Sequence, residues 1–417
     1  MIRFLSICFA LLISNAVYGT TAKSPVILLS VDGFSFSYLE KYQPKNLLAF
    51  AKSGVNTRLL PVYPSKTFPN HLSIITGTYP VNHGIIHNRF YHPELAQQYS
   101  LGAGKKNKTW LTSAPLWSVA EDNGIKSAIY FWPESETIGH TPPSYNIPYN
   151  KSTSNRTRID QLITWLKLPR NQRPNFIASY FSTIDSAGHH NGFDTPALIT
   201  AINEFDTLFG YFIERINREI SQSVNIILVS DHGMVPIAKE AQISTDLVLN
   251  NIKKKFKNIK IIYNDTQLFI YFDKHKVSNK IRKIRKIRKN IENILQLNKL
   301  MNKKSYNIYT KGSYPLHWHL NSDIGIVPDI IIEAEAPAIF TWKKVLTEFD
   351  GATHGFDPKT DPRLQGIFMA SGPNITQGRE LEPFKNIHVF PLLNALLGLN
   401  ENSDIDGQLS VLKSIIK

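Results

Sequence analysis

The sequence has almost no cysteine. Among its 417 residues only Cys8 is a cysteine, and it lies in an N-terminal segment, residues 1–22, that we expect to be removed as a secretory signal. The mature chain would then have neither a thiol nor a disulfide. Secreted eukaryotic proteins of this size usually carry disulfides. The absence therefore predicts a bacterial protein that works in the periplasm or outside the cell.

The sequence also lacks a long apolar run. The apolar core of the predicted signal extends only from Phe4 to Ile13, between Arg3 and the small residues of Ala16-Val17-Tyr18-Gly19. That core is too short to cross a bilayer, and no later segment is longer and equally apolar. We therefore expect a cleaved signal and no transmembrane span. An uncleaved anchor is the alternative.

Acidic residues are fewer than basic ones. The chain has 47 Lys and Arg against 33 Asp and Glu, which gives a net charge of +14. This balance favours anionic substrates or surfaces. No nucleic-acid-reading module is recognisable, so we expect a small-molecule substrate. A basic helix near residues 276–296 has isoleucine at every third or fourth position, which is typical of a helix packed on its own domain; binding to anionic lipid or nucleic acid is the alternative.

Apolar runs alternate with helical patterns along most of the chain. Buried strands are predicted at residues 25–31, 127–132, 176–181, 224–230 and 366–370, and helices at 37–53, 114–123, 156–167, 196–219 and 390–399. This alternation predicts an α/β fold in which a mostly parallel sheet is sandwiched between helices. We expect residues 23–417 to form a single domain. Residues 240–345 differ in texture and are predicted to form a small inserted lobe.

A helix is predicted to begin at or beside Thr67. This hydroxyl residue precedes Pro69 and an apolar run that ends at Gly77, an order of residue types that is typical of a helix start and stop. Free N–H groups and the positive end of the helix dipole would surround the hydroxyl, and such a place binds phosphate. The Thr67 hydroxyl could attack phosphorus if its pKa were lowered. A plain helix cap is the alternative.

Three carboxylates and three imidazoles lie in turn-like or glycine-flanked positions after apolar segments: Asp32, Asp185, His189, Asp231, His232 and His354. The carboxyl ends of parallel strands share one edge of a sheet, so the acids are expected to converge there. Imidazole and carboxylate ligands suit zinc, and also manganese or iron. Six are too many for one catalytic zinc and fit two, an arrangement that clamps both oxygens of a displacement at phosphorus.

These segments together resemble the nucleotide pyrophosphatase/phosphodiesterase family of the alkaline phosphatase superfamily. The matching blocks are residues 30–33 (SVDG), 63–71 (YPSKTFPNH), 76–80 (TGTYP), 83–88 (HGIIHN), 185–189 (DSAGH), 230–234 (SDHGM) and 354–357 (HGFD). They occur in the family's order and cover residues 25–400. The resemblance implies an alkaline-phosphatase-like fold with two zinc ions, one held by Asp185, His189 and His354 and the other by Asp32, Asp231 and His232 with Thr67 bound to it.

The resemblance also implies roles in catalysis. Thr67 would be the nucleophile and form a covalent phosphothreonine. The Asn88 side chain and the Thr67 N–H would hold a non-bridging phosphate oxygen, and Phe68 and Tyr180 would line the pocket for the organic group. The chain departs from the family at residues 131–136, where relatives typically have glycine, and it lacks the disulfides and extra domains of animal relatives.

The expected activity is hydrolysis of nucleotide phosphodiester or pyrophosphate bonds. Alternatives are a phospholipase C type of cleavage of choline or glycerol headgroup diesters, and a catalytically inactive secreted binding protein. A phosphomonoesterase is disfavoured because no arginine stands beside Thr67 to meet the added charge. Lys66 either steers phosphate or faces solvent, and His71, His87, Asp329 and Asp357 are interpreted as structural residues.

Overall fold

The structure is a computed structural model that describes residues 23–273, 280–302, 305–322, 324–341, 351–401 and 403–417. The predicted signal and its cysteine lie outside these residues, as does the beginning of the predicted basic helix. Among the helices in the described ranges, none combines the length and the apolar character that crossing a bilayer requires.

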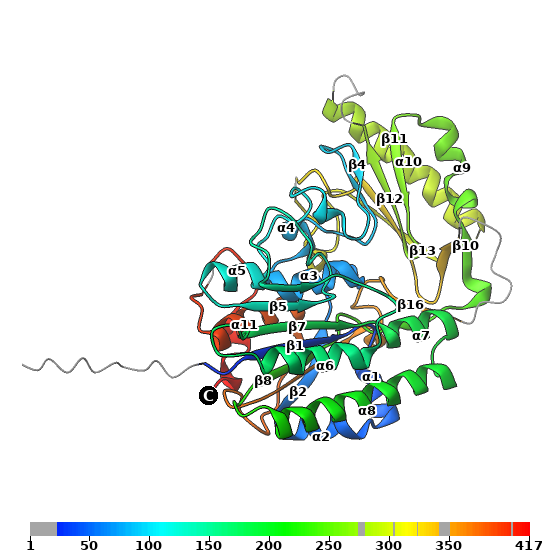
Figure 1. The fold of residues 1–417 in the computed structure, drawn as a ribbon. Coiled ribbons are helices and arrows are strands. Elements are labelled where there is room, and N and C mark those ends of the chain that lie inside the picture. The colour runs from blue at the N-terminus through cyan, green and yellow to red at the C-terminus, as the bar shows by residue number, and fades with distance from the viewer. Residues whose placement is uncertain (1–22, 274–279, 303–304, 323, 342–350, 402) are drawn as a thin grey trace, which may run out of the picture.

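An eight-stranded sheet forms the centre of the molecule (Figure 1). Its strands, in spatial order, are β18 (Phe384–Lys385), β2 (Val55–Leu60), β17 (Gly366–Ser371), β8 (Asn225–Val229), β1 (Val26–Val31), β7 (Phe176–Phe181), β5 (Ser127–Tyr130) and β6 (Tyr145–Ile147). Only β17 runs antiparallel to its neighbours in this sheet. The predicted α/β fold with a mostly parallel sheet is confirmed.

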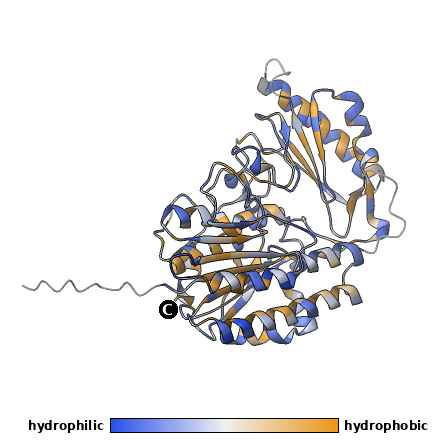
Figure 2. Ribbon diagram, viewed as in Figure 1, coloured by the Kyte–Doolittle hydropathy of each residue, from blue (hydrophilic) through white to orange (hydrophobic). Residues whose placement is uncertain are grey.

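Helices cover both faces of the sheet, so the central strands are apolar on both sides. In β1, Val26 and Leu28 join the core beneath α3 (Thr67–Thr76), α5 (Leu116–Asp122) and α11 (Val389–Leu397). Ile27, Leu29 and Val31 join the opposite core, beneath α2 (Lys45–Ser53), α6 (Asn155–Leu166) and α8 (Pro196–Glu219). Figure 2 shows the consequence: the strands are hydrophobic, and the helices carry their hydrophilic residues on the outside.

The prediction of one helix over residues 37–53 is wrong. The structure has two helices, α1 (Phe36–Tyr42) and α2, separated by Gln43 and Pro44. Gln43 adopts a positive φ of 49°, and a proline at 44 disfavours helical geometry at the residue before it. The other predicted helices and strands are present with ends that differ by a few residues, and α8 has the predicted bounds of 196–219.

Residues 242–341 form a lobe above the carboxyl edge of the central sheet (Figure 1). Its antiparallel sheet has the order β11 (Ile259–Tyr263), β12 (Gln267–Phe272), β14 (Ile330–Ala334) and β13 (Tyr306–Thr310). One face packs under α9 (Thr245–Lys255) and α10 (Lys280–Asn302). The other face contributes Phe269, Tyr271 and Ile331 to the core beneath α3. The lobe is therefore packed directly against the main domain.

The remaining elements are short or connect the lobe with the main sheet. They are α4 (Pro80–His83), β3 (Tyr91–His92), β4 (Gln97–Gln98), α7 (Thr183–Asn191), β9 (Val235–Pro236), β10 (Gln242–Ser244), β15 (Ile339–Thr341) and β16 (Ala352–Thr353). β16 pairs with β9 and β10 pairs with β15. These pairings bring residues near 235 and 353, far apart in the sequence, to the same edge of the molecule.

Candidate active site

Thr67 is the first residue of α3. Lys66, in an extended conformation, is the N-cap residue, so the Thr67 hydroxyl is not used to cap the helix. Pro69 lies in the first turn, where its missing N–H costs no hydrogen bond. The helix ends at Gly77, whose φ of 70° is left-handed. The predicted start and end of this helix are confirmed.

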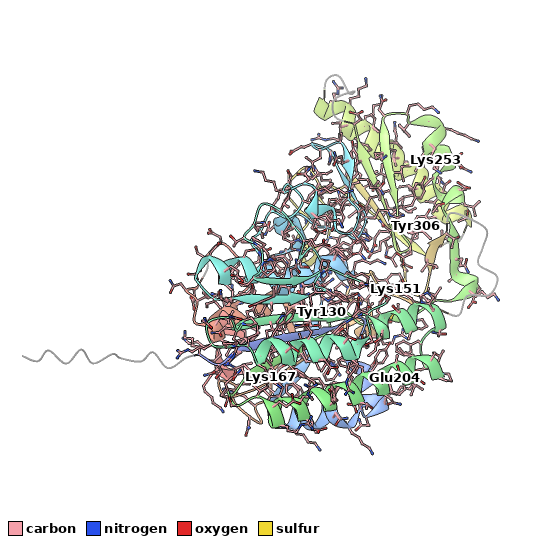
Figure 3. All side chains as sticks on the ribbon, viewed as in Figure 1. Tyr130, Lys151, Lys167, Glu204, Lys253 and Tyr306 are labelled. Carbon is pink, nitrogen blue, oxygen red and sulfur yellow. The ribbon has the colours of Figure 1, made fainter. Side chains whose placement is uncertain are left out.

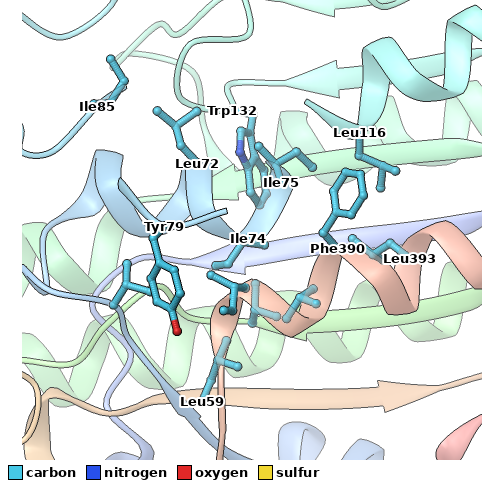
Figure 4. Packing of buried hydrophobic residues seen from close by; sticks show 14 of the residues in the cluster. Leu59, Leu72, Ile74, Ile75, Tyr79, Ile85, Leu116, Trp132, Phe390 and Leu393 are labelled. Atoms are coloured by element: carbon cyan, nitrogen blue, oxygen red, sulfur yellow. The ribbon is translucent and has the colours of Figure 1, made fainter. Parts of the chain in front are cut away.

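The position of α3 is fixed by a buried amide and by packing. Asn70 accepts a hydrogen bond from the N–H of Val62 at 2.8 Å and donates to the carbonyls of Pro64 and Lys66 at 2.9 and 2.8 Å. Leu72, Ile74 and Ile75 of α3 belong to the same buried core as Phe390 and Leu393 of α11, and Figure 4 shows Ile75 next to Phe390. The end of the helix that carries Thr67 is therefore held between a polar anchor and the core.

Three buried or largely buried carboxylates converge beside Thr67. Asp32 and Asp231 follow the adjacent parallel strands β1 and β8, and Asp185 lies in the first turn of α7, which follows β7. Gly33 permits their close approach: its φ is 71°, and a Cβ there would lie 2.9 Å from the Cα of Asp185. The topology therefore brings Asp32 together with Asp185 and Asp231, each about 150 or more residues away in the sequence.

Three histidines direct the same ring nitrogen at these acids. Nδ1 faces a backbone carbonyl in each case: that of Gly233 for His232 (3.1 Å), of Ala352 for His189 (3.0 Å) and of Ser65 for His354 (2.7 Å). A carbonyl only accepts, so Nδ1 carries the proton and Nε2 keeps its lone pair. This is the arrangement of metal-ligating histidines, in which the second nitrogen orients the ring.

The six side chains fall into two adjoining groups. In the first, Nε2 of His232 lies 2.9 Å from Oδ2 of Asp231 and 3.5 Å from Oδ1 of Asp32. The Thr67 hydroxyl lies 3.4 Å from the same nitrogen. In the second group, composed of Asp185, His189 and His354, the Asp185 Oδ1 and the two Nε2 atoms lie 3.1, 3.3 and 3.6 Å apart. The stacked rings of His232 and His354, 3.7 Å between centroids, join the groups.

The contacts within this cluster fit bound cations. Asp32 Oδ1, Asp185 Oδ1 and Asp231 Oδ2 are buried and have no hydrogen-bond partner in the described part of the chain. The Nε2 atoms of His189 and His354 face each other at 3.1 Å, so two lone pairs point toward each other. Such atoms gain from a metal ion between them, and carboxylate with imidazole is a donor set for zinc, manganese or iron.

Burial and neighbouring charges shift the pKa values of Asp32 and Asp231 in opposite directions. Burial raises the pKa of Asp32 well above its usual range, and the charges of Asp231 and Asp185 raise it further. Burial also raises the pKa of Asp231, but His232 and His71 more than offset this and the pKa is lowered. Strong perturbation of this kind is typical of functional sites.

Asn88 and Phe68 are half-buried and hydrogen-bonded to each other next to Thr67. Oδ1 of Asn88 accepts the N–H of Phe68 at 3.0 Å, so the Asn88 amide nitrogen is left as a donor for a ligand. Tyr180 has a further contact that the sequence did not indicate, since its hydroxyl donates to Oδ2 of Asp32 at 2.5 Å. Tyr180 therefore orients a candidate metal ligand.

The structure also tests the neighbouring residues. His71 is buried, with Nε2 2.8 Å from the Ser30 hydroxyl and Nδ1 2.9 Å from the Thr67 carbonyl, as expected for a structural hydrogen-bonder. The alternative that Lys66 faces solvent is wrong. Its side chain is buried and its ammonium lies 2.8 Å from Oδ1 of Asp265, a residue that no local pattern had singled out.

The segment at residues 131–136 has glycine-like geometry at two positions. Phe131 and Glu134 have φ values of 69° and 59°, a region that favours glycine. The Glu134 carboxylate accepts the Tyr99 hydroxyl at 2.5 Å and the N–H groups of Gly102 and Gly104, each at 3.0 Å. A side chain of the segment in which relatives are expected to have glycine thus binds the loop at residues 99–104.

Comparison with known proteins identifies the family. Residues 26–357 match the family model of type I phosphodiesterase / nucleotide pyrophosphatase. The chain belongs to this family. Its members include ectonucleotide pyrophosphatase/phosphodiesterases, which are hydrolases of phosphodiester and pyrophosphate bonds.

Similarity to a fungal and an animal relative covers most of this chain. The chain is 31% identical to an uncharacterized pyrophosphatase/phosphodiesterase of Schizosaccharomyces pombe, over 95% of this chain and 81% of the relative. It is 33% identical to bovine ectonucleotide pyrophosphatase/phosphodiesterase family member 3, over 94% of this chain but only 44% of that protein. The chain thus spans less than half of the larger animal relative.

Solved structures agree with the fold. Murine ectonucleotide pyrophosphatase/phosphodiesterase 5 superposes with a TM-score of 0.82 and 26% identity, over 94% of this chain and all of that chain. An inactive variant of the murine protein, solved in complex with AMP, superposes with the same TM-score and 25% identity over 95% of this chain.

Proposed function

We propose that the chain is a two-zinc phosphodiesterase and nucleotide pyrophosphatase that acts through a covalent phosphothreonine. The position of one hydroxyl carries the proposal. Thr67 Oγ1 lies at the N-terminal end of α3 and 3.4 Å from Nε2 of His232. The helix end suits a phosphate, and the neighbouring ligand cluster suits a cation that lowers the pKa of the hydroxyl.

The metal ligands follow from the two groups. Asp185, His189 and His354 would hold one zinc ion, and Asp32, Asp231 and His232 would hold the other beside Thr67. When bound, the ions supply Lewis-acid stabilisation of the charge that develops around phosphorus. Manganese and iron are compatible with the same donors.

The chain's own groups would make and break the bonds. Thr67 Oγ attacks phosphorus and its proton passes to solvent; the leaving oxygen departs with its bonding electrons. A water molecule then displaces the Thr67 oxygen, which regains a proton. The Asn88 amide nitrogen and the Thr67 N–H would donate to a non-bridging oxygen, where donors have most effect because charge develops there in the transition state.

Nucleotide diesters are the substrates we favour, with a nucleoside monophosphate as product. The AMP complex of the murine relative supports this choice, as does the family description. Phe68, half-buried and next to Thr67, would offer an aromatic surface to the organic group, and Tyr180, predicted to line the same pocket, contacts Asp32.

The direct test is hydrolysis of p-nitrophenyl thymidine monophosphate by the purified mature chain. We expect turnover that a chelator abolishes and zinc restores, and loss of about 10³-fold or more in kcat for Thr67→Ala at unchanged metal content. Asn88→Ala should lower kcat by about 10²-fold. An unimpaired Thr67→Ala variant would refute the mechanism.

Two other results would change the assignment. Turnover of p-nitrophenyl phosphocholine in preference to the nucleotide diester would assign the enzyme to headgroup diesters. Tightly bound zinc without turnover of either substrate would indicate a binding protein.

We further propose export, with removal of residues 1–22, to the periplasm or the exterior of a bacterial cell. N-terminal sequencing of protein recovered from each compartment tests this. A mature protein that retains residue 1 would contradict it.

A further inference from the structure

The residue before the nucleophile takes part in an ion pair with the lobe. Lys66 is only 5% exposed, and its Nζ lies 2.8 Å from Oδ1 of Asp265. Asp265 lies in the turn between β11 and β12 of the lobe. Its second oxygen, Oδ2, accepts the hydroxyl of Thr353 at 2.8 Å. One carboxylate thus contacts both the segment that carries Thr67 and the segment that carries His354.

The pair lies against the candidate metal site. A Cβ on Gly355, the residue after His354, would lie 2.8 Å from Nζ of Lys66 and 2.2 Å from its Cε. The Lys66 ammonium is therefore packed on the backbone beside His354. Electrostatics agree with this geometry: burial and then Lys66 set the pKa of Asp265, which is lowered because the ammonium outweighs the burial.

The charge of Lys66 matters because of what the substrates carry. A phosphodiester has one negative charge, whereas a phosphomonoester above its second pKa of about 6 has almost two. A free ammonium on the backbone beside His354, at the edge of the candidate metal site, would favour the dianion by Coulomb attraction in a partly buried site. Paired with Asp265, the ammonium contributes little net charge.

We propose that Asp265 is a specificity-determining residue that holds Lys66 in a neutral pair and so favours monoanionic diesters over dianionic monoesters. This inference rests on the proposed phosphodiesterase function. The nucleophile and the candidate metal ligands all belong to the main domain. The lobe, through Asp265, would then help to select the charge of the substrate.

The test measures kcat/KM for p-nitrophenyl phosphate and for p-nitrophenyl thymidine monophosphate at pH 8, at equal metal content. Asp265→Asn keeps the side-chain shape and removes the negative charge, so the ratio of monoester to diester should rise about tenfold. Lys66→Met keeps the aliphatic packing and leaves an unpaired carboxylate, so the ratio should fall. The double variant should return close to the wild-type ratio.

The matched control is Asp329→Asn, another acid-to-amide change in the lobe. Asp329 is 4% exposed and pairs with Arg288 at 3.1 Å, so it has the same kind of partner without contacting the site. The monoester-to-diester ratio of kcat/KM should be the same in Asp329→Asn as in wild type. A purely structural role of the Lys66–Asp265 pair would lower both activities in both variants and would not shift the ratio in opposite directions.

The outcomes are separable. A wild-type chain that turns over neither substrate refutes the proposed function. A wild-type diesterase whose ratio is unchanged in both Asp265→Asn and Lys66→Met overturns only the role of Asp265, as does a shift of both variants in the same direction. If Asp265→Asn does not fold, Lys66→Met alone decides, since a ratio that does not fall contradicts the inference.

Discussion

Helix α2 has its N-terminal cap supplied by another helix. Its N-cap residue, Pro44, offers no side-chain hydrogen bond. Asp206 of α8, 7% exposed, accepts the N–H of Leu47 at 2.9 Å and both the N–H and the side-chain amide of Asn46, at 3.2 and 2.9 Å. A carboxylate at this end of the helix also interacts favourably with the dipole. We predict that Asp206 is a major contributor to the stability of this helical layer.

The magnitude follows from which donors Asp206→Ala leaves unpaired. The N–H of Leu47 is buried and would lose a charged acceptor, at a cost of about 2 kcal/mol. Asn46 is exposed, so water can replace its two bonds for about 1 kcal/mol together. The free energy of unfolding should fall by about 3 kcal/mol. Asp206→Asn, which keeps one acceptor oxygen, should lose about half as much.

The assay is urea unfolding followed by far-UV circular dichroism at a fixed metal concentration, with kcat/KM measured on the same preparations. Glu204→Ala is the matched control, because Glu204 is exposed two residues away on the same helix, in the outer layer of the molecule (Figure 3). It should leave stability nearly unchanged. A loss below about 1 kcal/mol for Asp206→Ala, or a fall in kcat/KM of the folded variant, would refute the reasoning.

Three further changes give distinct expectations. Gly33→Ala would place a Cβ 2.9 Å from Asp185 at a φ of 71°, so metal content after dialysis should fall below that of wild type; full retention would contradict the close approach. Tyr180→Phe removes the donor 2.5 Å from Asp32, and metal affinity should weaken about tenfold by competition with a chelator. Hydrogen bonding to Arg215 lowers the pKa of Glu219 from 4.5 to about 2, so its charge stabilises the fold above pH 4.5 and this contribution is lost as the pH falls toward 2. In the metal-free protein, the urea midpoint should therefore fall less steeply between pH 4.5 and 2 for Glu219→Gln than for wild type. An unchanged slope would count against the ion pair.

Long apolar runs made the central sheet predictable from sequence. Strands β1, β7 and β8 are buried on both faces, so each is a continuous run of mostly apolar residues that stands out from the flanking sequence. Strand β2, which lies between β17 and the two-residue strand β18, was missed because its six residues, VNTRLL, contain no continuous apolar run. Helix α7 was missed because only Ile184 and Gly188 of its nine residues are buried, which leaves no apolar stripe to recognise.

The candidate site was predictable to a different extent. The gathering of Thr67 with the three acids and three histidines agrees with the resemblance, whereas the roles assigned to those residues stay predictions. Asp265 could not have been found, since it meets Lys66 across 199 residues and lies in a lobe whose packing no local pattern specifies. The bacterial source inferred from the lack of disulfides also stays a prediction, as the relatives described above are eukaryotic.

The place of β17 in the sheet has a consequence for how the chain matures. This strand, residues 366–371, lies between β2 and β8 and hydrogen-bonds to both. Until the ribosome has made it, β2 has no partner on that side and the apolar edge of β8 is open, a condition that invites aggregation. Closure of the sheet therefore requires residues 366–371, and we expect a nascent chain stopped before residue 366 to be a substrate for chaperones. Such a delay is compatible with the export proposed above, which would need an unfolded chain.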